Sequence, residues 1–220
     1  MAKMMMLVDP SRCTGCRGCQ VACKQWNENP AVATTFVGSY QNPPALDGDT
    51  YTIVRFEEHE LNEFDVYWLM TSDRCRHCAE PTCIEALPKG SYEITEQGAV
   101  VFNEKALGNL QDVVDSCPFA IPTKNKKTGR IVKCTLCADR IADDMEPACA
   151  KACPTDAIMW GGYDEMLDYA KKRIAWLKSP VNKHRFKADK VKLYPGEDFP
   201  SHVKWILIDD LEKHGLEGEV

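Results

Sequence analysis

The segment CTGCRGCQVAC, residues 13–23, spaces its four cysteines as C-x2-C-x2-C-x3-C. A loop with this spacing can wrap an iron–sulfur cube, because it presents three thiolates from successive turns of irregular backbone. Its N–H groups point inward and offset the negative charge of the cluster. The fourth cysteine, Cys23, follows after three intervening residues. We expect it to lie on the helix that follows the loop and to point away from this cluster. The spacing therefore predicts one cluster and one thiolate left over for a second.

The remaining cysteines complete this pattern. The chain has 220 residues and twelve cysteines, which is enough for three four-cysteine clusters. The first and last groups have the same number of members, and Pro154 directly follows the last one. In chain order the groups are Cys13, Cys16, Cys19 and Cys23; Cys75, Cys78 and Cys83; Cys117; and Cys134, Cys137, Cys149 and Cys153. This arithmetic predicts a protein that conducts electrons.

Disulfides and zinc are the two alternatives for so many cysteines. Cysteines as close as Cys13, Cys16 and Cys19 cannot bridge one another without strain, and a chain of this length can bury a core without disulfides. The C-x2-C pairs that begin at Cys75 and Cys134 could each be half of a zinc ribbon. The first group does not fit a ribbon, so the sequence favours iron–sulfur clusters.

Charge and hydropathy limit the partners. The formal net charge of −6 gives no electrostatic reason to expect nucleic acid or an anionic membrane surface. The apolar run at residues 4–8 is too short for a signal sequence or a membrane span, and it predicts a first strand. We expect no transmembrane segment. If the protein works outside the cytoplasm, it must travel folded with a partner that carries the signal.

A ferredoxin pattern appears twice along the chain, with one copy nested inside the other, which predicts an α+β fold of two bacterial 2[4Fe-4S]-type modules. Residues 1–32 and 123–162 form the first module, and residues 66–122 form an inserted second module. Residues 33–65 connect them and carry one strand. Residues 163–220 add a C-terminal helix and a tail.

Local patterns place the elements of these modules. Met166, Ala170, Ile174 and Leu177 recur at helical spacing and predict a helix after Gly162. We expect further helices at 20–26 and 138–141, and strands at 4–8, 51–56, 131–132, 157–160 and 203–208.

Two-cluster ferredoxins exchange their fourth ligands between half-modules, and this rule groups the cysteines. Set one is Cys13, Cys16, Cys19 and Cys153. Set two is Cys23, Cys134, Cys137 and Cys149. The cysteines that remain form set three, which is Cys75, Cys78, Cys83 and Cys117.

Five motifs resemble the iron–sulfur subunits of the molybdopterin (molybdenum or tungsten) oxidoreductases over about residues 4–165. They are SRCTGCRGCQVACKQW, CRHCAEPTC, SCPFAIP, KCTLCADRI and PACAKACPTDAI. Members of that family usually hold four cubanes. At the positions of the terminal cluster this chain has Leu87, Leu107, Leu110 and Val113. Leu107, Leu110 and Val113 also read as one apolar helix face. We expect all four side chains to fill the volume that a cube would occupy, buried together beside set three.

A three-cluster chain without a membrane anchor looks most like the small subunit of soluble, two-subunit formate dehydrogenases, a match that the phrases CRGCQVACKQW and QNPP strengthen. The resemblance implies a large partner that holds a tungsten or molybdenum bis-pterin and one further [4Fe-4S] cluster. Formate would be oxidised there, and electrons would pass through sets one, two and three to a cytochrome or ferredoxin. It also implies a periplasmic protein co-exported with its partner, with the cytoplasm as the alternative.

Several cations lie close to cysteines in the sequence. Lys24, Arg74 and Arg76 could raise the reduction potential of a cluster, or they could be solvated surface charges. A second group of cations surrounds the turn Thr128-Gly129, and we expect it to be a solvated hairpin face. It consists of Lys124, Lys126, Lys127, Arg130 and Lys133.

No catalytic constellation is recognisable, so we expect no catalytic residue on this chain. Two other functions remain open at this stage. One is the same role beside another molybdopterin enzyme, such as a polysulfide, thiosulfate or arsenate reductase or a transhydroxylase. The other is a free-standing polyferredoxin.

Overall fold

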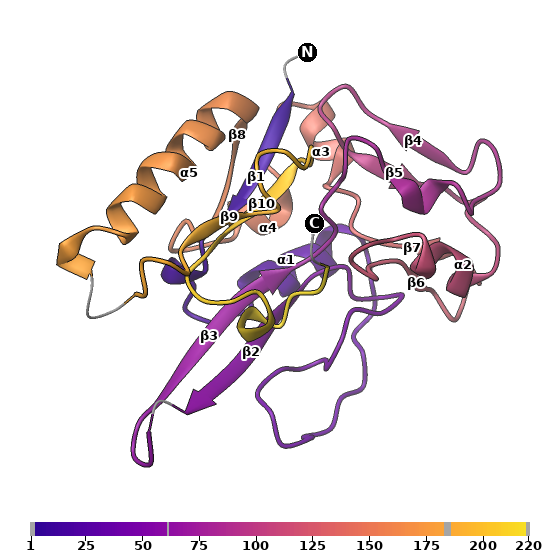
Figure 1. The fold of residues 1–220 in the computed structure, drawn as a ribbon. Helices are drawn as coiled ribbons and strands as arrows, with labels where there is room; N and C mark the ends of the chain where they lie inside the picture. Colours follow the sequence, from indigo (N-terminus) through magenta and orange to yellow (C-terminus); the bar gives the residue numbers. More distant parts are fainter. Residues whose placement is uncertain (1–2, 61, 183–185, 219–220) are drawn as a thin grey trace.

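The computed structural model describes residues 3–60, 62–182 and 186–218. Short helices and small sheets alternate with long loops in a mixed α/β arrangement (Figure 1). The strands pair within four small sheets in the described part of the chain. The division into one module nested within another stays a proposal.

A four-stranded sheet in the order β8-β1-β10-β9 brings the two ends of the described chain together. Its strands are β8 (Ile158–Gly162), β1 (Met4–Val8), β10 (Val203–Leu207) and β9 (Lys192–Tyr194). Strand β1 runs antiparallel to β8 and parallel to β10. The C-terminal residues therefore supply half of this sheet: the strand expected at 203–208 is β10, and β9 is an addition that the sequence did not suggest.

Strand β1 is apolar throughout because both of its faces are covered. Met5 and Leu7 pack with residues of α5 (Tyr163–Leu177), which lies along one face of the sheet in Figure 1. Met6 and Val8 point to the opposite face and pack with cysteines, including Cys19 and Cys134. Alternation along a strand thus turns one face of the sheet toward the helix and the other toward the cysteines.

The other elements are short and lie beside the cysteine loops. Helix α1 follows the first loop and begins two residues earlier than expected. Three antiparallel hairpins extend from this centre, β2 with β3, β4 with β5 and β6 with β7. The bounds are α1 Gly18–Trp26, α2 Leu110–Asp115, α3 Ala138–Ala142, α4 Ala148–Lys151, β2 Ile53–Glu60, β3 Val66–Asp73, β4 Tyr92–Ile94, β5 Val100–Phe102, β6 Thr123–Lys124 and β7 Ile131–Val132, with 3-10 turns at Pro10–Arg12, Thr82–Ile84, Pro180–Asn182 and Glu212–His214.

A small apolar cluster lies beside Cys83, where the aliphatic residues were expected. Leu87 and Val113 are buried in it, and Leu110 packs against it. The prediction is wrong for Leu107, whose side chain is 49% exposed. Its neighbour Ala106 is buried in the cluster instead. Residue 107 precedes helix α2, so it does not share the inward face of that helix.

Truncating the buried leucine should therefore cost far more than truncating the exposed one. We expect Leu87→Ala to lower the free energy of unfolding by about 2–5 kcal/mol, because a buried leucine leaves a cavity. Leu107→Ala serves as the control and should change it by less than about 0.5 kcal/mol. Anaerobic denaturant unfolding of the cluster-loaded protein measures both. Equal losses in the two variants would contradict this packing.

Candidate metal centres

Three cavities of about 300–360 Å³ are each lined by four cysteines. The first cavity is lined by set one, the second by set two and the third by set three. All twelve thiols are free, so the structure contradicts the disulfide alternative. The structure thus brings together the same groups that the ferredoxin rule predicts, and their role as ligands remains a proposal.

Three of the C-x2-C loops, 13–16, 75–78 and 134–137, turn sharply at the residue before the second cysteine. Gly15, His77 and Leu136 have φ values of 64°, 47° and 56° at this position. Two of them are not glycine, although this left-handed conformation is uncommon for other residues. The amides of His77 and Leu136 donate to the sulfurs of Cys75 and Cys134, each at 3.4 Å. The strained backbone thus turns N–H groups toward the thiols.

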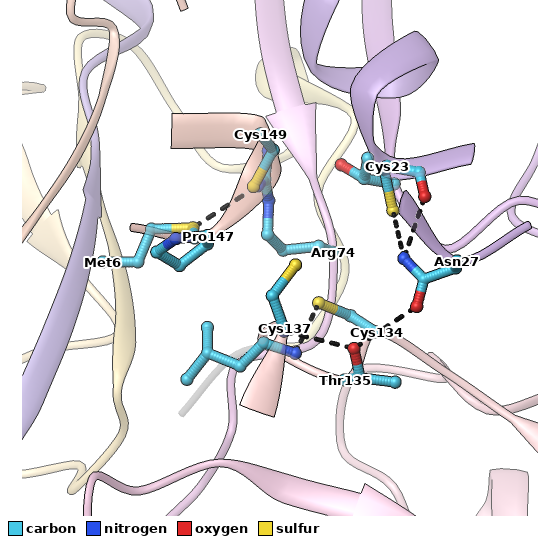
Figure 2. A pocket seen from close by; sticks show the side chains of 11 residues that line it. Met6, Cys23, Asn27, Arg74, Cys134, Thr135, Cys137, Pro147 and Cys149 are labelled. Carbon is cyan, nitrogen blue, oxygen red and sulfur yellow. Dashed lines mark hydrogen bonds between the residues drawn. The ribbon is translucent and has the colours of Figure 1, made fainter. Parts of the chain in front are cut away.

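The second cavity is the most enclosed of the three. All four thiols of set two are buried, whereas Cys16 of set one is exposed and Cys78 and Cys117 of set three are half-buried. Figure 2 shows Cys23, Cys134, Cys137 and Cys149 around this cavity, together with Arg74. The Arg74 Nη1 donates to Cys149 Sγ at 2.7 Å. Set two is therefore an internal site, and sets one and three reach the surface.

Burial raises the pKa of many of these thiols. The pKa reaches about 11 at Cys13 and Cys137 and about 12 at Cys78, Cys83 and Cys134. Neighbouring thiolates add to the rise, as Cys149 does for Cys134. Without a metal these thiols stay protonated at neutral pH, and coordination is what removes the proton.

The cavities also contain donors that lack an acceptor. His77 lines the third cavity, and its Nδ1 accepts from the Val100 N–H, so the proton is on Nε2. Among the described residues, that Nε2 is buried without a partner, as is Nε of Arg74 in the second cavity. Sulfur atoms of a cubane are acceptors that such donors could use. Four thiols and an unpaired donor fit an iron–sulfur cluster.

Zinc has less geometric support. Among the described residues, no three or more Cys, His, Asp or Glu side chains are placed to hold a single metal ion. A structural zinc site needs four such ligands around one ion.

Only one of the three expected tuning cations contacts a thiol, and that is Arg74. Lys24 donates to the carbonyl oxygens of Pro30 and Asp49. Arg76 is paired with Asp73 at 2.8 Å and lies over the rings of Phe119 and Trp205. Lys24 and Arg76 therefore have other partners.

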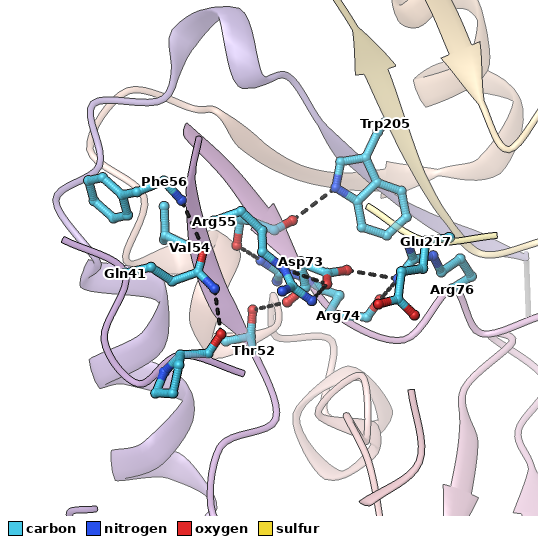
Figure 3. A network of polar contacts seen from close by, with 12 residues as sticks. Gln41, Thr52, Val54, Arg55, Phe56, Asp73, Arg74, Arg76, Trp205 and Glu217 are labelled. Carbon is cyan, nitrogen blue, oxygen red and sulfur yellow. Dashed lines mark hydrogen bonds and ion pairs between the residues drawn. The ribbon is translucent and has the colours of Figure 1, made fainter. Parts of the chain in front are cut away.

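A network of polar contacts around Asp73 holds the start of the loop that carries Cys75 of set three. Asp73 also accepts from Arg55 at 2.8 Å, and the indole of Trp205 donates to the carbonyl of Ser72 (Figure 3). Strand β3 ends at Asp73, two residues before Cys75. Strand β10 is thereby tied to the loop that presents Cys75.

The sequence-based interpretation was wrong for Lys133, which is only 4% exposed. Its Nζ donates to the carbonyl oxygens of Val100 and Cys134, and the side chain lines the third cavity. Strand alternation could have revealed this, because Lys133 is two residues after the buried Ile131 and so lies on the same face.

The sequence also led us to expect no transmembrane segment. In the described part of the chain, no helix is long and apolar enough to cross a bilayer.

Comparisons with known proteins place the chain among iron–sulfur proteins. Residues 66–163 match the family described as a 4Fe-4S dicluster domain. The chain is 42% identical over 181 residues to formate dehydrogenase 2 subunit beta (cytochrome c-553) of Nitratidesulfovibrio vulgaris, which covers 79% of this chain and 83% of that relative.

Two relatives from Escherichia coli extend the comparison. The iron–sulfur subunit of nitrate-inducible formate dehydrogenase is 41% identical over 184 residues, which cover 83% of this chain and 62% of that relative. The B subunit of anaerobic dimethyl sulfoxide reductase is 31% identical over 160 residues, which cover 72% of this chain and 73% of that relative. The similarity to the formate dehydrogenase subunits is thus higher than the similarity to the sulfoxide reductase subunit.

Proposed function

Because this protein belongs to the family of formate dehydrogenase iron–sulfur (beta) subunits, we propose that it holds three [4Fe-4S] clusters and conducts electrons for such an enzyme. The electrons would come from a large catalytic subunit with a tungsten or molybdenum bis-pterin and its own [4Fe-4S] cluster. That subunit would oxidise formate or reduce carbon dioxide, and this chain would have no catalytic residue. The observation that carries the proposal is three cavities with four free thiols each.

The exposure of the thiols supports an order along the chain of sites. When bound, each cubane supplies a centre that takes up and releases one electron. Cys16 brings set one to the surface, and Cys78 and Cys117 bring set three toward it. The buried set two lies between them, since Cys19 of set one is linked to Cys149 through Ser72 and Arg74. On the other side, Lys133 lines the cavity of set three and precedes Cys134 of set two.

We infer that set one faces the catalytic subunit and that set three faces the external carrier. The family resemblance supports this direction, because the terminal cluster that is missing beyond set three would have lain at the exit. The name of the N. vulgaris relative includes cytochrome c-553. A cytochrome or a ferredoxin is therefore the proposed acceptor for this chain. The periplasm, reached together with the catalytic subunit, is the proposed location.

Metal analysis of the purified protein tests the number of clusters. We expect about twelve irons and about twelve sulfides per chain, because three complete sets each bind one [4Fe-4S] cluster. Anaerobic iron and acid-labile sulfide assays measure this. About eight or sixteen of each would contradict the assignment, and zinc in place of iron would overturn the class of site.

Purification under anaerobic conditions tests the partner. We expect a large pterin-binding chain to co-purify with this one and formate to bleach the clusters of the complex. If dithionite-reduced clusters were reoxidised by a sulfoxide or by polysulfide, and oxidised clusters did not respond to formate, another molybdopterin enzyme would be favoured, in line with the sulfoxide reductase relative. Clusters in a chain that purifies alone would favour a free-standing polyferredoxin.

A further inference from the structure

Two buried cations lie between the cysteine sets without a carboxylate partner. Arg74 has no exposed surface and Lys133 is 4% exposed. Within the described residues neither of them forms a salt bridge, although the equally buried Arg76 is paired with Asp73. Burying an unpaired charge is costly unless another negative group compensates for it. The groups that can compensate here are the thiolates and whatever they bind.

Arg74 spans sets one and two. Its Nη1 donates to Cys149 Sγ of set two at 2.7 Å, and its Nη2 donates to the Ser72 hydroxyl. The same hydroxyl lies 3.5 Å from Cys19 Sγ of set one. One guanidinium group therefore reaches both sets, directly at set two, where Figure 2 shows Arg74 among the thiols, and through the Ser72 hydroxyl at set one.

Lys133 spans sets two and three. Its Nζ is 3.3 Å from the carbonyl oxygen of Cys134, a member of set two, and 4.8 Å from the centre of the Phe102 ring. Its side chain lines the cavity of set three. The ammonium group therefore lies between set two and the cavity of set three.

We propose that Arg74 raises the reduction potentials of the clusters at sets one and two, and that Lys133 raises the potential of the cluster at set three. The proposal rests on the proposed function, because it presupposes clusters at these sets. Each electron that arrives adds one negative charge in a region from which water is excluded, so a fixed positive charge nearby favours the reduced form. Each junction between neighbouring sites is then bridged by one buried cation.

A redox titration of the intact complex, followed by electron paramagnetic resonance, tests this assignment. We expect Arg74→Gln to lower the ratio of reduced to oxidised cluster about tenfold at a fixed potential for sets one and two, which is 59 mV for a one-electron couple. The cluster at set three should keep its potential. Lys133→Met should lower the reduction potential of the cluster at set three more than the potentials of the clusters at sets one and two. Signals are assigned with the Cys153→Ser and Cys83→Ala proteins described in the Discussion.

Lys24→Gln is the matched control. Lys24 is next to Cys23 in sequence, but its Nζ is bound to the carbonyl oxygens of Pro30 and Asp49, so removing its charge should shift no potential. A common shift of all three clusters in the Arg74 and Lys133 variants, or no shift in either, would overturn the proposal. A shift of the same size in Lys24→Gln would overturn it too.

If Arg74→Gln or Lys133→Met loses a cluster, more conservative substitutions are tested instead. Iron is measured in every sample, and if Arg74→Gln fails to hold its clusters, Ser72→Ala and Arg74→Lys replace it. Ser72→Ala keeps the charge but removes the link to Cys19, so it should lower the potential at set one more than at set two. Arg74→Lys should keep both potentials near those of the wild type, and Lys133→Arg should do so at set three. A larger decrease at set two than at set one in Ser72→Ala would contradict the proposal. So would a large decrease in potential in either charge-conserving variant, Arg74→Lys or Lys133→Arg. A wild-type protein without three titrating clusters would instead refute the proposed function.

Discussion

Replacing Cys83 with alanine is expected to abolish formate-driven reduction of an external carrier by the complex. Cys83 is a buried member of set three, and its loss removes one of four proposed ligands. Formate should still reduce the clusters at sets one and two, because they precede set three in the proposed order. Steady-state reduction of a cytochrome or ferredoxin measures the first effect, and electron paramagnetic resonance after formate addition measures the second.

A nearby exposed residue controls for nonspecific damage to the same segment. Glu85 is exposed two residues away, so Glu85→Ala should keep carrier reduction close to that of the wild type. Carrier reduction that persists in Cys83→Ala at the wild-type rate would show that set three is not the exit. A loss of formate-reducible signal at all three sets would show that set three lies at the entrance.

The opposite pattern is expected when set one is damaged. Cys153→Ser should remove or distort the cluster at set one, whose other thiols are Cys13, Cys16 and Cys19. Formate should then reduce none of the remaining clusters, because the catalytic subunit would have lost its electron acceptor on this chain. Dithionite, which needs no route through the protein, should still reduce the clusters at sets two and three.

This variant should also weaken the joint between the two ends of the chain. A cluster at set one would close a loop of roughly 135 residues, and cross-links over long loops restrict the unfolded chain most. We expect the cluster-loaded Cys153→Ser protein to have a lower denaturant midpoint than cluster-loaded Cys83→Ala, in which the lost cluster closed a shorter loop. Loss confined to the cluster at Cys134 and Cys137 would show that the crossed grouping is wrong. Cys153→Ala, which offers no oxygen ligand, separates loss of the cluster from serine ligation.

Local spacing predicted the arrangement of the cysteines well because the constraint is local. Cys13, Cys16 and Cys19 are fixed by the turns between them, and the ferredoxin rule adds the distant Cys153 to the same cavity. Helical periodicity likewise placed Ala170 on the inner face of α5. Such features depend on the residue types and on one short segment at a time.

Features that depend on several segments were missed. Arg74 precedes Cys75 of set three, yet its side chain lines the second cavity and reaches Cys149 of set two, just after the end of strand β3. Lys133 follows a turn rich in cations, but it directly follows β7 and is buried like Ile131 two residues before it. Leu107 fits the apolar spacing of Leu110 and Val113, but helix α2 begins only at Leu110. Sequence neighbours carry no information on such long-range contacts.

The pairing of β1 with β10 has a consequence for how the protein is made. Met6 and Val203 are partners in the sheet, so the edge of β1 that faces β10 stays unpaired until nearly two hundred further residues have been translated. Strand β8 can cover the other edge earlier, but until β10 is made the apolar segment Met4–Val8 keeps one unpaired edge, which is prone to aggregate. Cys19 must wait in the same way for Cys153. The clusters proposed for sets one and two can therefore be completed only after about two thirds of the chain has been synthesised, whereas all the thiols of set three are present once Cys117 has been made.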